Sequence, residues 1–216
     1  MSEIANQEVK KTGDIGGMFK DTVILLVITL AAGLLLGLVY QITKEPIAVQ
    51  KEKTKQEACK AVFAEAASFT EVELIEPDAQ EWAAAGFAQE TVDEVMEAQD
   101  ASGAVLGYVI TVTTKEGYGG DIRFTIGITK DGTVNGIAIL EIAETAGLGM
   151  RAEEVLAPQF AAKNVEKFEY SKSGAAADNQ IDAISGATIT TNAVTNGVNA
   201  GLYYFQTTLP ADGQGN

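Results

Sequence analysis

Hydrophobic and polar positions follow three different rhythms along the 216-residue chain. The first is an apolar run over residues 22–43, which contains no charged residue and is rich in Leu, Ile and Val. As a helix rising about 1.5 Å per residue, this run spans about 33 Å and can cross a bilayer core of roughly 30 Å. A cleaved signal peptide would have a shorter apolar core and a small-x-small site, which residues 39–41 do not provide. The run therefore predicts an uncleaved transmembrane anchor after a short polar tail at residues 1–21.

The second rhythm is the alternation typical of β-strands. Residues 122–129 alternate strictly between apolar and other side chains, which predicts a half-buried strand. Residues 105–114 alternate in part and are rich in β-forming types. Asp131-Gly132 is a hairpin signal between the strand at 122–129 and a further strand at 134–142. Together they predict an antiparallel meander with one face that helices must cover.

The third rhythm is helical. Val194, Val198, Leu202 and Phe205 recur at spacings of four, four and three, which puts them on one face of a C-terminal helix. Pro46 suits the first turn of a second helix, expected over residues 47–67. In that helix Val62, Phe63 and Ala66 should face inward. A third helix is expected at 151–162, helix and loop without chemistry at 71–100, and a polar loop at 170–180.

Charge and composition exclude several kinds of function. The chain has no histidine, which removes the usual zinc ligand, the usual general base and any Ser-His-Asp triad. Its single cysteine, Cys59, cannot ligate an iron–sulfur cluster and is expected to be a half-buried structural thiol. A net charge of −15 disfavours nucleic acid as a partner. Redox chemistry would therefore need an organic cofactor, and we expect neither a metal site nor catalytic residues.

The stretch Asp182-Ala183-Ile184-Ser185-Gly186-Ala187-Thr188 leads directly into the C-terminal helix. Ser185 stands where an N-cap is expected, and Gly186 and Ala187 let a ligand approach the backbone. A helix start presents free N–H groups that welcome a phosphate, and Thr188 adds a hydroxyl there. The alternative is a plain loop that ends in an N-cap, with Asp182 as a solvated cap.

This stretch resembles the flavinylation signature of the FMN-binding subunits of ion-pumping redox complexes, in which an acidic residue precedes Ser/Thr-Gly-Ala-Thr. In that family the last threonine carries FMN through a phosphoester bond, so the resemblance implies a covalent FMN on Thr188. It further implies that Ser185, Gly186 and Ala187 contact the FMN and that Asp182 has a role in maturation.

Two glycine-containing loops resemble the same family. One is Gly117-Tyr118-Gly119-Gly120-Asp121; the other is Glu144-Thr145-Ala146-Gly147-Leu148-Gly149. In the family such segments help to build the flavin pocket, which implies cofactor contacts from Tyr118, Glu144, Thr145, Gly147, Leu148 and Gly149. Proline is common in the family at positions 121 and 146, which here hold Asp121 and Ala146. Each loop alone could equally be an ordinary turn.

The resemblance covers residues 20–207 and is closest to the G subunits of Rnf complexes. The C subunits of sodium-pumping NADH:quinone reductases are similar in the same motifs and are the alternative. It implies an electron-carrying subunit of an ion-translocating ferredoxin:NAD oxidoreductase complex in the cell membrane. Its partners would be the other membrane subunits, the lipid bilayer and, during maturation, a flavin transferase that uses FAD and magnesium.

The predicted fold class is α+β, with one N-terminal transmembrane helix followed by an FMN-binding domain of antiparallel sheet and helices. The domain should cover residues 44–208, before a C-terminal tail at 209–216. More lysines follow the anchor than precede it, which by simple counting puts the domain in the cytoplasm. The family resemblance instead implies that the domain lies outside the cytoplasm. Gly33 and Gly37 form a G-x-x-x-G pair that permits close helix packing.

Two functions of other classes fit the same residues. The chain could be a membrane-tethered scaffold or binding module without a cofactor, in which case the purified protein would be colourless. It could also be a sensor whose pocket lies between the glycine loops, and it would then release a small molecule on denaturation.

Overall fold

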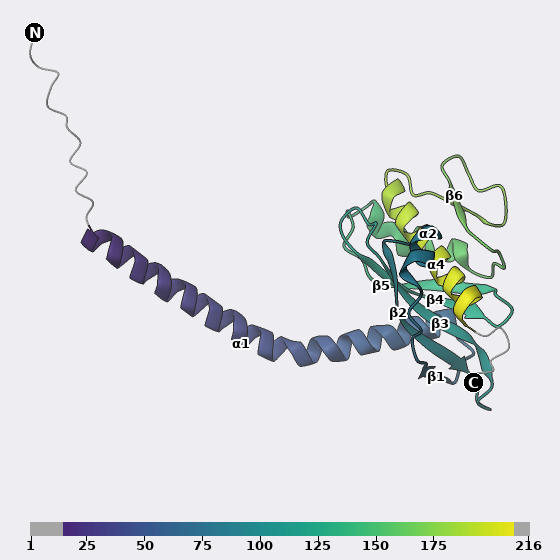
Figure 1. The fold of residues 1–216 in the computed structure, drawn as a ribbon, viewed down its shortest axis with the longest axis horizontal. Helices are drawn as coiled ribbons and strands as arrows, with labels where there is room; N and C mark the ends of the chain where they lie inside the picture. Colours follow the sequence, from purple (N-terminus) through teal and green to yellow (C-terminus); the bar gives the residue numbers. More distant parts are fainter. Residues whose placement is uncertain (1–14, 210–216) are drawn as a thin grey trace, which may run out of the picture. The chain divides into compact units, whose positions relative to one another are not determined.

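The computed structural model describes residues 15–209, which form two compact units divided between Glu52 and Lys53. The N-terminal unit is helical and apolar, and the C-terminal unit is an antiparallel sheet with helices (Figure 1). This architecture confirms the predicted α+β class. The outermost parts of both predicted tails, residues 1–14 and 210–216, lie outside the described residues.

The first helix, α1, is longer than the sequence predicts and runs without a break over Ile15–Val62. Residues 15–21, which we expected in the polar tail, are helical. Pro46, which we expected to begin a new helix, lies inside α1. Proline removes one i→i−4 hydrogen bond, but the neighbouring turns carry the helix past it. Among the described residues, this helix alone is long and apolar enough to cross a bilayer, with a window of mean hydropathy 2.8.

The C-terminal unit is built on a five-stranded antiparallel meander in the order β1 to β5. The strands are β1 (Ser68–Glu71), β2 (Glu90–Gln99), β3 (Val105–Thr114), β4 (Ile122–Thr129) and β5 (Val134–Glu141). The last three were predicted, and Gly132 makes the expected β4–β5 turn with φ +84°. The expectation of helix and loop at 71–100 holds for α2 (Ala79–Ala84) and the loops beside it but is wrong for residues 90–99, which form β2. A bulge between Val92 and Glu94 interrupts its alternation and hides the period of two.

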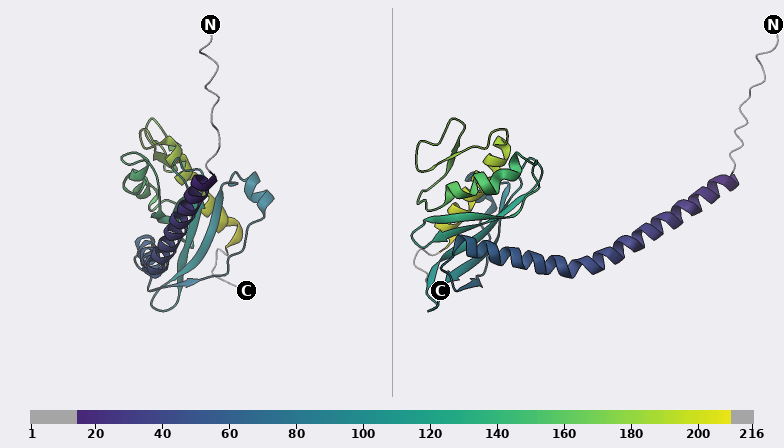
Figure 2. Two further views of the ribbon diagram at one scale, coloured as in Figure 1. Left: turned by 90° about the vertical axis from the view of Figure 1, so that its left-hand side faces the viewer. Right: turned by 180° about the vertical axis from the view of Figure 1, so that it is seen from behind.

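One face of this sheet is covered by α4, which spans Thr188–Thr208 (Figures 1 and 2). Its predicted apolar face is confirmed, because Val194, Val198 and Leu202 are fully buried. Two glycines let the helix approach the strands closely. A Cβ on Gly197 would lie 2.7 Å from Cζ of Phe124, and one on Gly201 would lie 2.4 Å from Cδ1 of Ile126. The main core therefore sits between α4 and the sheet.

The opposite face is covered by the last turns of α1, so β4 is buried on both sides and not on one as expected. Val62 fills the space where Gly127 has no side chain, and the Phe63 ring does the same at Gly107. Cys59 belongs to this second cluster and is 2% exposed, more deeply buried than predicted. Its sulfur lies 3.9 Å from that of Met96. The inward positions predicted for Val62, Phe63 and Ala66 are confirmed.

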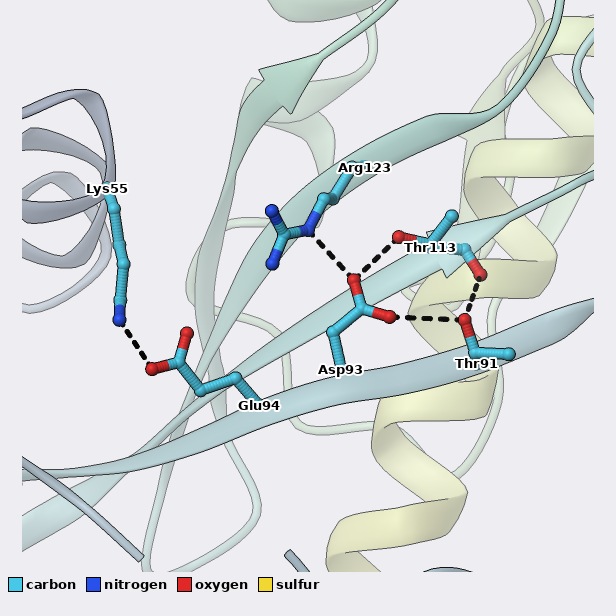
Figure 3. A network of polar contacts seen from close by, with 6 residues as sticks. All are labelled: Lys55, Thr91, Asp93, Glu94, Thr113 and Arg123. Carbon is cyan, nitrogen blue, oxygen red and sulfur yellow. Dashed lines mark hydrogen bonds and ion pairs between the residues drawn. The ribbon is translucent and has the colours of Figure 1, made fainter. Parts of the chain in front are cut away.

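Polar contacts at the edge of this second cluster join three strands (Figure 3). Asp93 on β2 accepts hydrogen bonds from Nε of Arg123 at 2.8 Å and from the Thr113 hydroxyl at 2.7 Å. On the same strand, Glu94 pairs with Lys55 of α1. These half-exposed pairs fix how the strands and the end of α1 meet, while most of the stability comes from the apolar clusters.

Short elements complete the unit. They are α2 (Ala79–Ala84), η1 (Gly149–Arg151), α3 (Ala152–Val155), η2 (Ala157–Phe160) and a parallel ribbon of β6 (Glu169–Ser171) and β7 (Gln180–Asp182). The single helix predicted at 151–162 is therefore wrong, because Pro158 at the start of η2 cannot continue the α3 ladder. The loop expected at 170–180 begins and ends in the two ribbon strands.

Candidate functional site

Three segments that are distant in the sequence line a pocket of about 520 Å³ in the C-terminal unit. The loop after β3 contributes Tyr118. The loop after β5 contributes Glu144, Thr145, Leu148 and Gly149, and the start of α4 contributes Gly186, Ala187, Thr188, Ile189 and Thr190. The structure therefore brings together eight of the ten residues that the sequence proposes as a cofactor site.

The start of α4 differs in detail from the sequence prediction. Ser185 is exposed in a turn and does not cap the helix; Ala187 occupies the N-cap position without a side-chain cap. Gly186 adopts φ +78°, the left-handed conformation that glycine tolerates, and this turn separates Ser185 from the helix axis. The amides of Thr188, Ile189 and Thr190 consequently have no intrahelical partner and can receive an anion.

Thr191 holds this turn in place from beneath. Its hydroxyl donates to the Ala187 carbonyl at 3.0 Å and accepts from the Ile184 amide at 3.1 Å. Both bonds are buried, so the turn keeps its shape without help from Ser185. Sequence reasoning missed Thr191, although a buried hydroxyl four residues after a turn is a common i→i−4 partner.

Thr188 is the half-buried first residue of α4 and lines the pocket. Within residues 15–209, no protein group is hydrogen-bonded to its hydroxyl. Thr190 is 1% exposed and also borders the pocket. Residues two apart do not share a helix face, so helical spacing gave no signal for Thr190. Both line the pocket because its wall is the end of the helix and not its side.

Glu144 joins the two glycine-containing loops. It is 9% exposed, and its Oε1 accepts a hydrogen bond from the Tyr118 amide at 2.8 Å. Gly149 packs so closely that a Cβ would lie 2.5 Å from the Thr190 hydroxyl and 2.7 Å from Cβ of Glu144. Only glycine fits at this position without displacing the base of the pocket.

Apolar side chains surround the mouth of the pocket. Tyr118 is 71% exposed, Ile189 52% and Leu148 40%, which are high values for large apolar residues in a folded domain. They come from three different segments, so no single loop accounts for their exposure. A pocket with backbone amides at one wall and an apolar rim is suited to a ligand with an anionic end and a flat apolar part.

Three residues of the predicted site lie outside the pocket lining. Ser185 lies in the exposed turn, and Gly147 is exposed with φ +77°. Asp182 ends β7, where its carboxylate accepts a hydrogen bond from the Ala175 amide and its own amide donates to Oε1 of Gln159 at 2.7 Å. These contacts show that Asp182 shapes the preceding loop.

Comparisons with known proteins match both units. The fold resembles the crystal structure of Shewanella oneidensis NqrC, with a TM-score of 0.48 and 19% identity over 68% of this chain and 84% of that one. The family model of the FMN-binding domain matches residues 117–203, which include the whole pocket lining, and that of the RnfG N-terminal region matches residues 17–62. By these two family models, the chain is an FMN-binding protein with an N-terminal apolar helix.

Relatives of similar length show which family of FMN-binding proteins the chain resembles. The G subunit of the Na⁺-translocating ferredoxin:NAD⁺ oxidoreductase complex of Acetobacterium woodii is 33% identical over 88% of this chain and 92% of the relative. The G subunit of the proton-translocating complex of Clostridium ljungdahlii is 30% identical over 87% and 91%. The G subunit of the ion-translocating oxidoreductase complex of Methanosarcina acetivorans is 30% identical over 86% and 93%. The chain belongs to the family of G subunits of Rnf ion-translocating oxidoreductase complexes.

Proposed function

We propose that this protein carries electrons within its complex through an FMN attached covalently to Thr188 by a phosphoester bond. The observation that carries the proposal is the position of the Thr188 hydroxyl, which has no hydrogen-bonding partner among the described residues and stands at the pocket beside three amides that lack intrahelical partners. The phosphate would be bound by these amides, as anions are at other helix N-termini. Isoalloxazine supplies the electron-transfer chemistry when FMN is bound.

The pocket residues fit this cofactor. A volume of about 520 Å³ falls in the range of small-molecule sites. Tyr118, Leu148 and Ile189 offer apolar surface for the ring, and Gly149 keeps the base of the pocket open. Glu144 positions the loop of Tyr118 through the amide hydrogen bond. In this proposal the chain binds and orients the cofactor, and no side chain acts as a catalytic acid or base.

Attachment would need a partner enzyme during maturation. A threonine hydroxyl is a poor nucleophile at neutral pH, so a flavin transferase must activate it. The oxygen of Thr188 would form a bond to the FMN phosphorus of FAD, the bond to AMP would break, and the hydroxyl proton would leave to solvent. Asp182 would serve this step indirectly, because its contacts with Ala175 and Gln159 fix the strand from which the chain enters the turn before Thr188.

The test is the flavin content of the denatured protein. The wild-type chain, co-expressed with a flavin transferase, should give a fluorescent band after denaturation and a peptide heavier by one FMN at Thr188. Thr188→Val keeps the shape and removes the oxygen, so this band should be dark. Thr207→Val, at the exposed far end of the same helix, is the matched control and should stay fluorescent. A colourless wild type, or a fluorescent Thr188→Val band, contradicts the proposal.

We also propose that residues 22–43 span the cell membrane and that residues 44–208 lie outside the cytoplasm. The length and hydropathy of α1 support the span. The family resemblance supports the orientation, and the lysine count argues only weakly against it because long domains after an anchor can translocate regardless of charge. A protease added to intact protoplasts should digest the domain. Digestion only after lysis would reverse the orientation.

A further inference from the structure

A buried carboxyl lies outside the pocket, at the first residue of β2. Glu90 is 2% exposed, and its Oε1 accepts a hydrogen bond from the Thr114 hydroxyl at 3.1 Å. Its other oxygen, Oε2, is buried and has no hydrogen-bond partner in the described part of the chain. An ionised carboxylate with an unpaired oxygen is costly in such a place, so Glu90 binds a proton more readily than an exposed glutamate does.

The neighbours of Glu90 offer it no positive charge. Thr114 faces it from β3 and Trp82 from α2, where the indole nitrogen donates to the Glu90 carbonyl at 2.9 Å. The whole of α4 lacks a charged residue; it faces this region with two asparagines and with the titratable Tyr203 beside Phe87. The loop after β3 brings one carboxylate, Glu116, while the side chain of Lys115 is exposed.

Burial and charge act on Glu90 in the same direction. Desolvation raises the pKa of this carboxyl above its ordinary value, and the negative charge of Glu116 raises it further. The hydrogen bond from Thr114 and smaller interactions with the backbone at Gln89 and Glu90 lower the pKa but do not offset the other two effects.

Glu116 connects this carboxyl to the pocket. Its amide donates to the Thr114 hydroxyl at 3.3 Å, and that hydroxyl donates to Glu90. Glu116 also precedes the loop that carries Tyr118, whose amide is held by Glu144 in the pocket lining. The connection from Glu90 to the pocket is thus a continuous series of hydrogen bonds and two peptide units.

A second connection runs through α4. Oε2 of Glu116 accepts hydrogen bonds from Asn192 at 3.2 Å and from Asn196 at 2.7 Å. Asn192 lies one turn after Thr188, so Glu116 bonds both to the helix that begins at the pocket and, through Thr114, to Glu90.

We propose that Glu90 and Glu116 form a proton-binding site whose occupancy is linked to the redox state of the cofactor in the neighbouring pocket. Electrons added there increase the negative charge near two carboxyl groups, neither of which forms a salt bridge within residues 15–209. Glu90 then takes up a proton from solvent and becomes neutral, while the electrons come from the external donor. The linkage rests on the proposed function, but the proton site itself does not require a flavin.

A proton fits this site better than a metal ion. Within residues 15–209, no cluster of three or more Asp, Glu, Cys or His side chains could hold a metal. The amide nitrogens of both asparagines donate hydrogen bonds to Glu116, and coordination of a metal ion by Glu116 would not require these bonds. One proton removes the cost of the buried charge without further ligands.

The first experiment measures the proton site without a cofactor. The full chain with Thr188→Val, purified in detergent and labelled with ¹³C at the glutamate carboxyls, is titrated by NMR, and Glu90→Gln identifies the Glu90 signal. That signal should titrate above the range of the exposed glutamates. A signal that titrates with the exposed glutamates, or one that shifts on addition of sodium or calcium at constant pH, overturns the proton site.

The second experiment measures the linkage. Midpoint potentials of the flavin-loaded wild type and Glu90→Gln are compared over a series of pH values. The two should coincide at low pH, where Glu90 is neutral in both redox states. As the pH rises, the wild type should become harder to reduce, and at a fixed potential the ratio of oxidised to reduced flavin should differ several-fold from that of Glu90→Gln.

A control separates this linkage from a general charge effect. Glu97→Gln removes a carboxylate from the same strand at a distance of about 23 Å along β2. This variant should follow the wild type at every pH. Parallel curves for wild type and Glu90→Gln would overturn the linkage, and a normal Glu90 titration in the first experiment would overturn the site. A protein without covalent flavin contradicts only the proposed function, because the first experiment still reports on Glu90.

Discussion

The first turn of α4 and the rest of the same helix differ in their surroundings. From Val194 to Phe205 the helix is packed against the sheet, with glycines that bring it within contact of Phe124 and Ile126. The first turn, Thr188–Thr190, has no side-chain cap and faces a pocket. The packing of Val194 to Phe205, the body of the helix, is sufficient to stabilise α4. The amides of its first turn therefore need no cap and remain available to a ligand. Each part can therefore be changed with little effect on the other.

The largest expected effect on folding comes from the body of the helix. Leu202→Ala removes a fully buried side chain and should lower the free energy of unfolding by about 2–5 kcal/mol, measured by urea denaturation. Flavin attachment below the unfolding transition should remain complete, because the first turn is untouched. Equal loss of stability and attachment would show that the two parts of α4 are not separable.

The next effect lies at the base of the pocket. Gly149→Ala places a Cβ against the Thr190 hydroxyl and Glu144, and this overpacking should cost about 1–3 kcal/mol and shift the flavin absorbance. Gly147→Ala is the control. It strains a residue with φ +77° by about 1 kcal/mol but meets no atom within 4 Å, so the spectrum should not change. A Gly149→Ala spectrum that matches the wild type would mean that Gly149 is an ordinary turn residue.

A smaller effect separates the two hydroxyls that flank the helix start. Thr191→Val removes two buried hydrogen bonds and should cost about 1–2 kcal/mol in urea denaturation. Ser185→Ala removes an exposed hydroxyl that does not cap the helix and should change stability by less than about 0.5 kcal/mol. The reverse order would show that Ser185 caps the helix in solution.

The smallest expected effect concerns the contribution of Glu90, at the start of β2, to the pH dependence of stability. Because the pKa of Glu90 is raised in the folded chain, its stabilising contribution is complete below the ordinary value of 4.5. This contribution is lost as the pH rises from there through the raised pKa. Glu90→Gln should remove this fall in the free energy of unfolding, followed by urea denaturation at several pH values. An equal pH dependence of stability in the wild type and Glu90→Gln contradicts the assignment.

Sequence patterns were sufficient to predict an element where a single physical requirement determines its structure. Strict alternation in β4, the Asp131-Gly132 turn and the apolar face of α4 each reflect a single period or conformation, and all three were predicted. The assembly of the pocket was also predictable, because its loops carry motifs of a known family. The helix through Pro46 was not, since local propensity alone cannot show that the turns on both sides of a proline remain helical.

Other features depend on contacts between distant segments. The bulge in β2 hides its alternation until β3 supplies the register. Ser185 matches an N-cap by residue type, but Thr191 holds the turn and so makes a cap unnecessary. Glu90 looks like one of many acidic residues in the sequence, and only the fold places it beneath α4 next to Glu116. Such residues are defined by tertiary surroundings that no local pattern encodes.

The glycines beneath the last turns of α1 have a practical consequence for preparing a water-soluble fragment. Gly107 and Gly127 leave hollows in the sheet that Phe63 and Val62 fill. A fragment that starts after Phe63 would expose this apolar surface to water, and neighbouring molecules would adhere to it. A fragment that starts at Lys53 keeps Val62 and Phe63, which cover this surface, and omits the apolar run. The part of α1 from Lys53 onward is therefore better regarded as the first piece of the globular unit than as the end of an anchor.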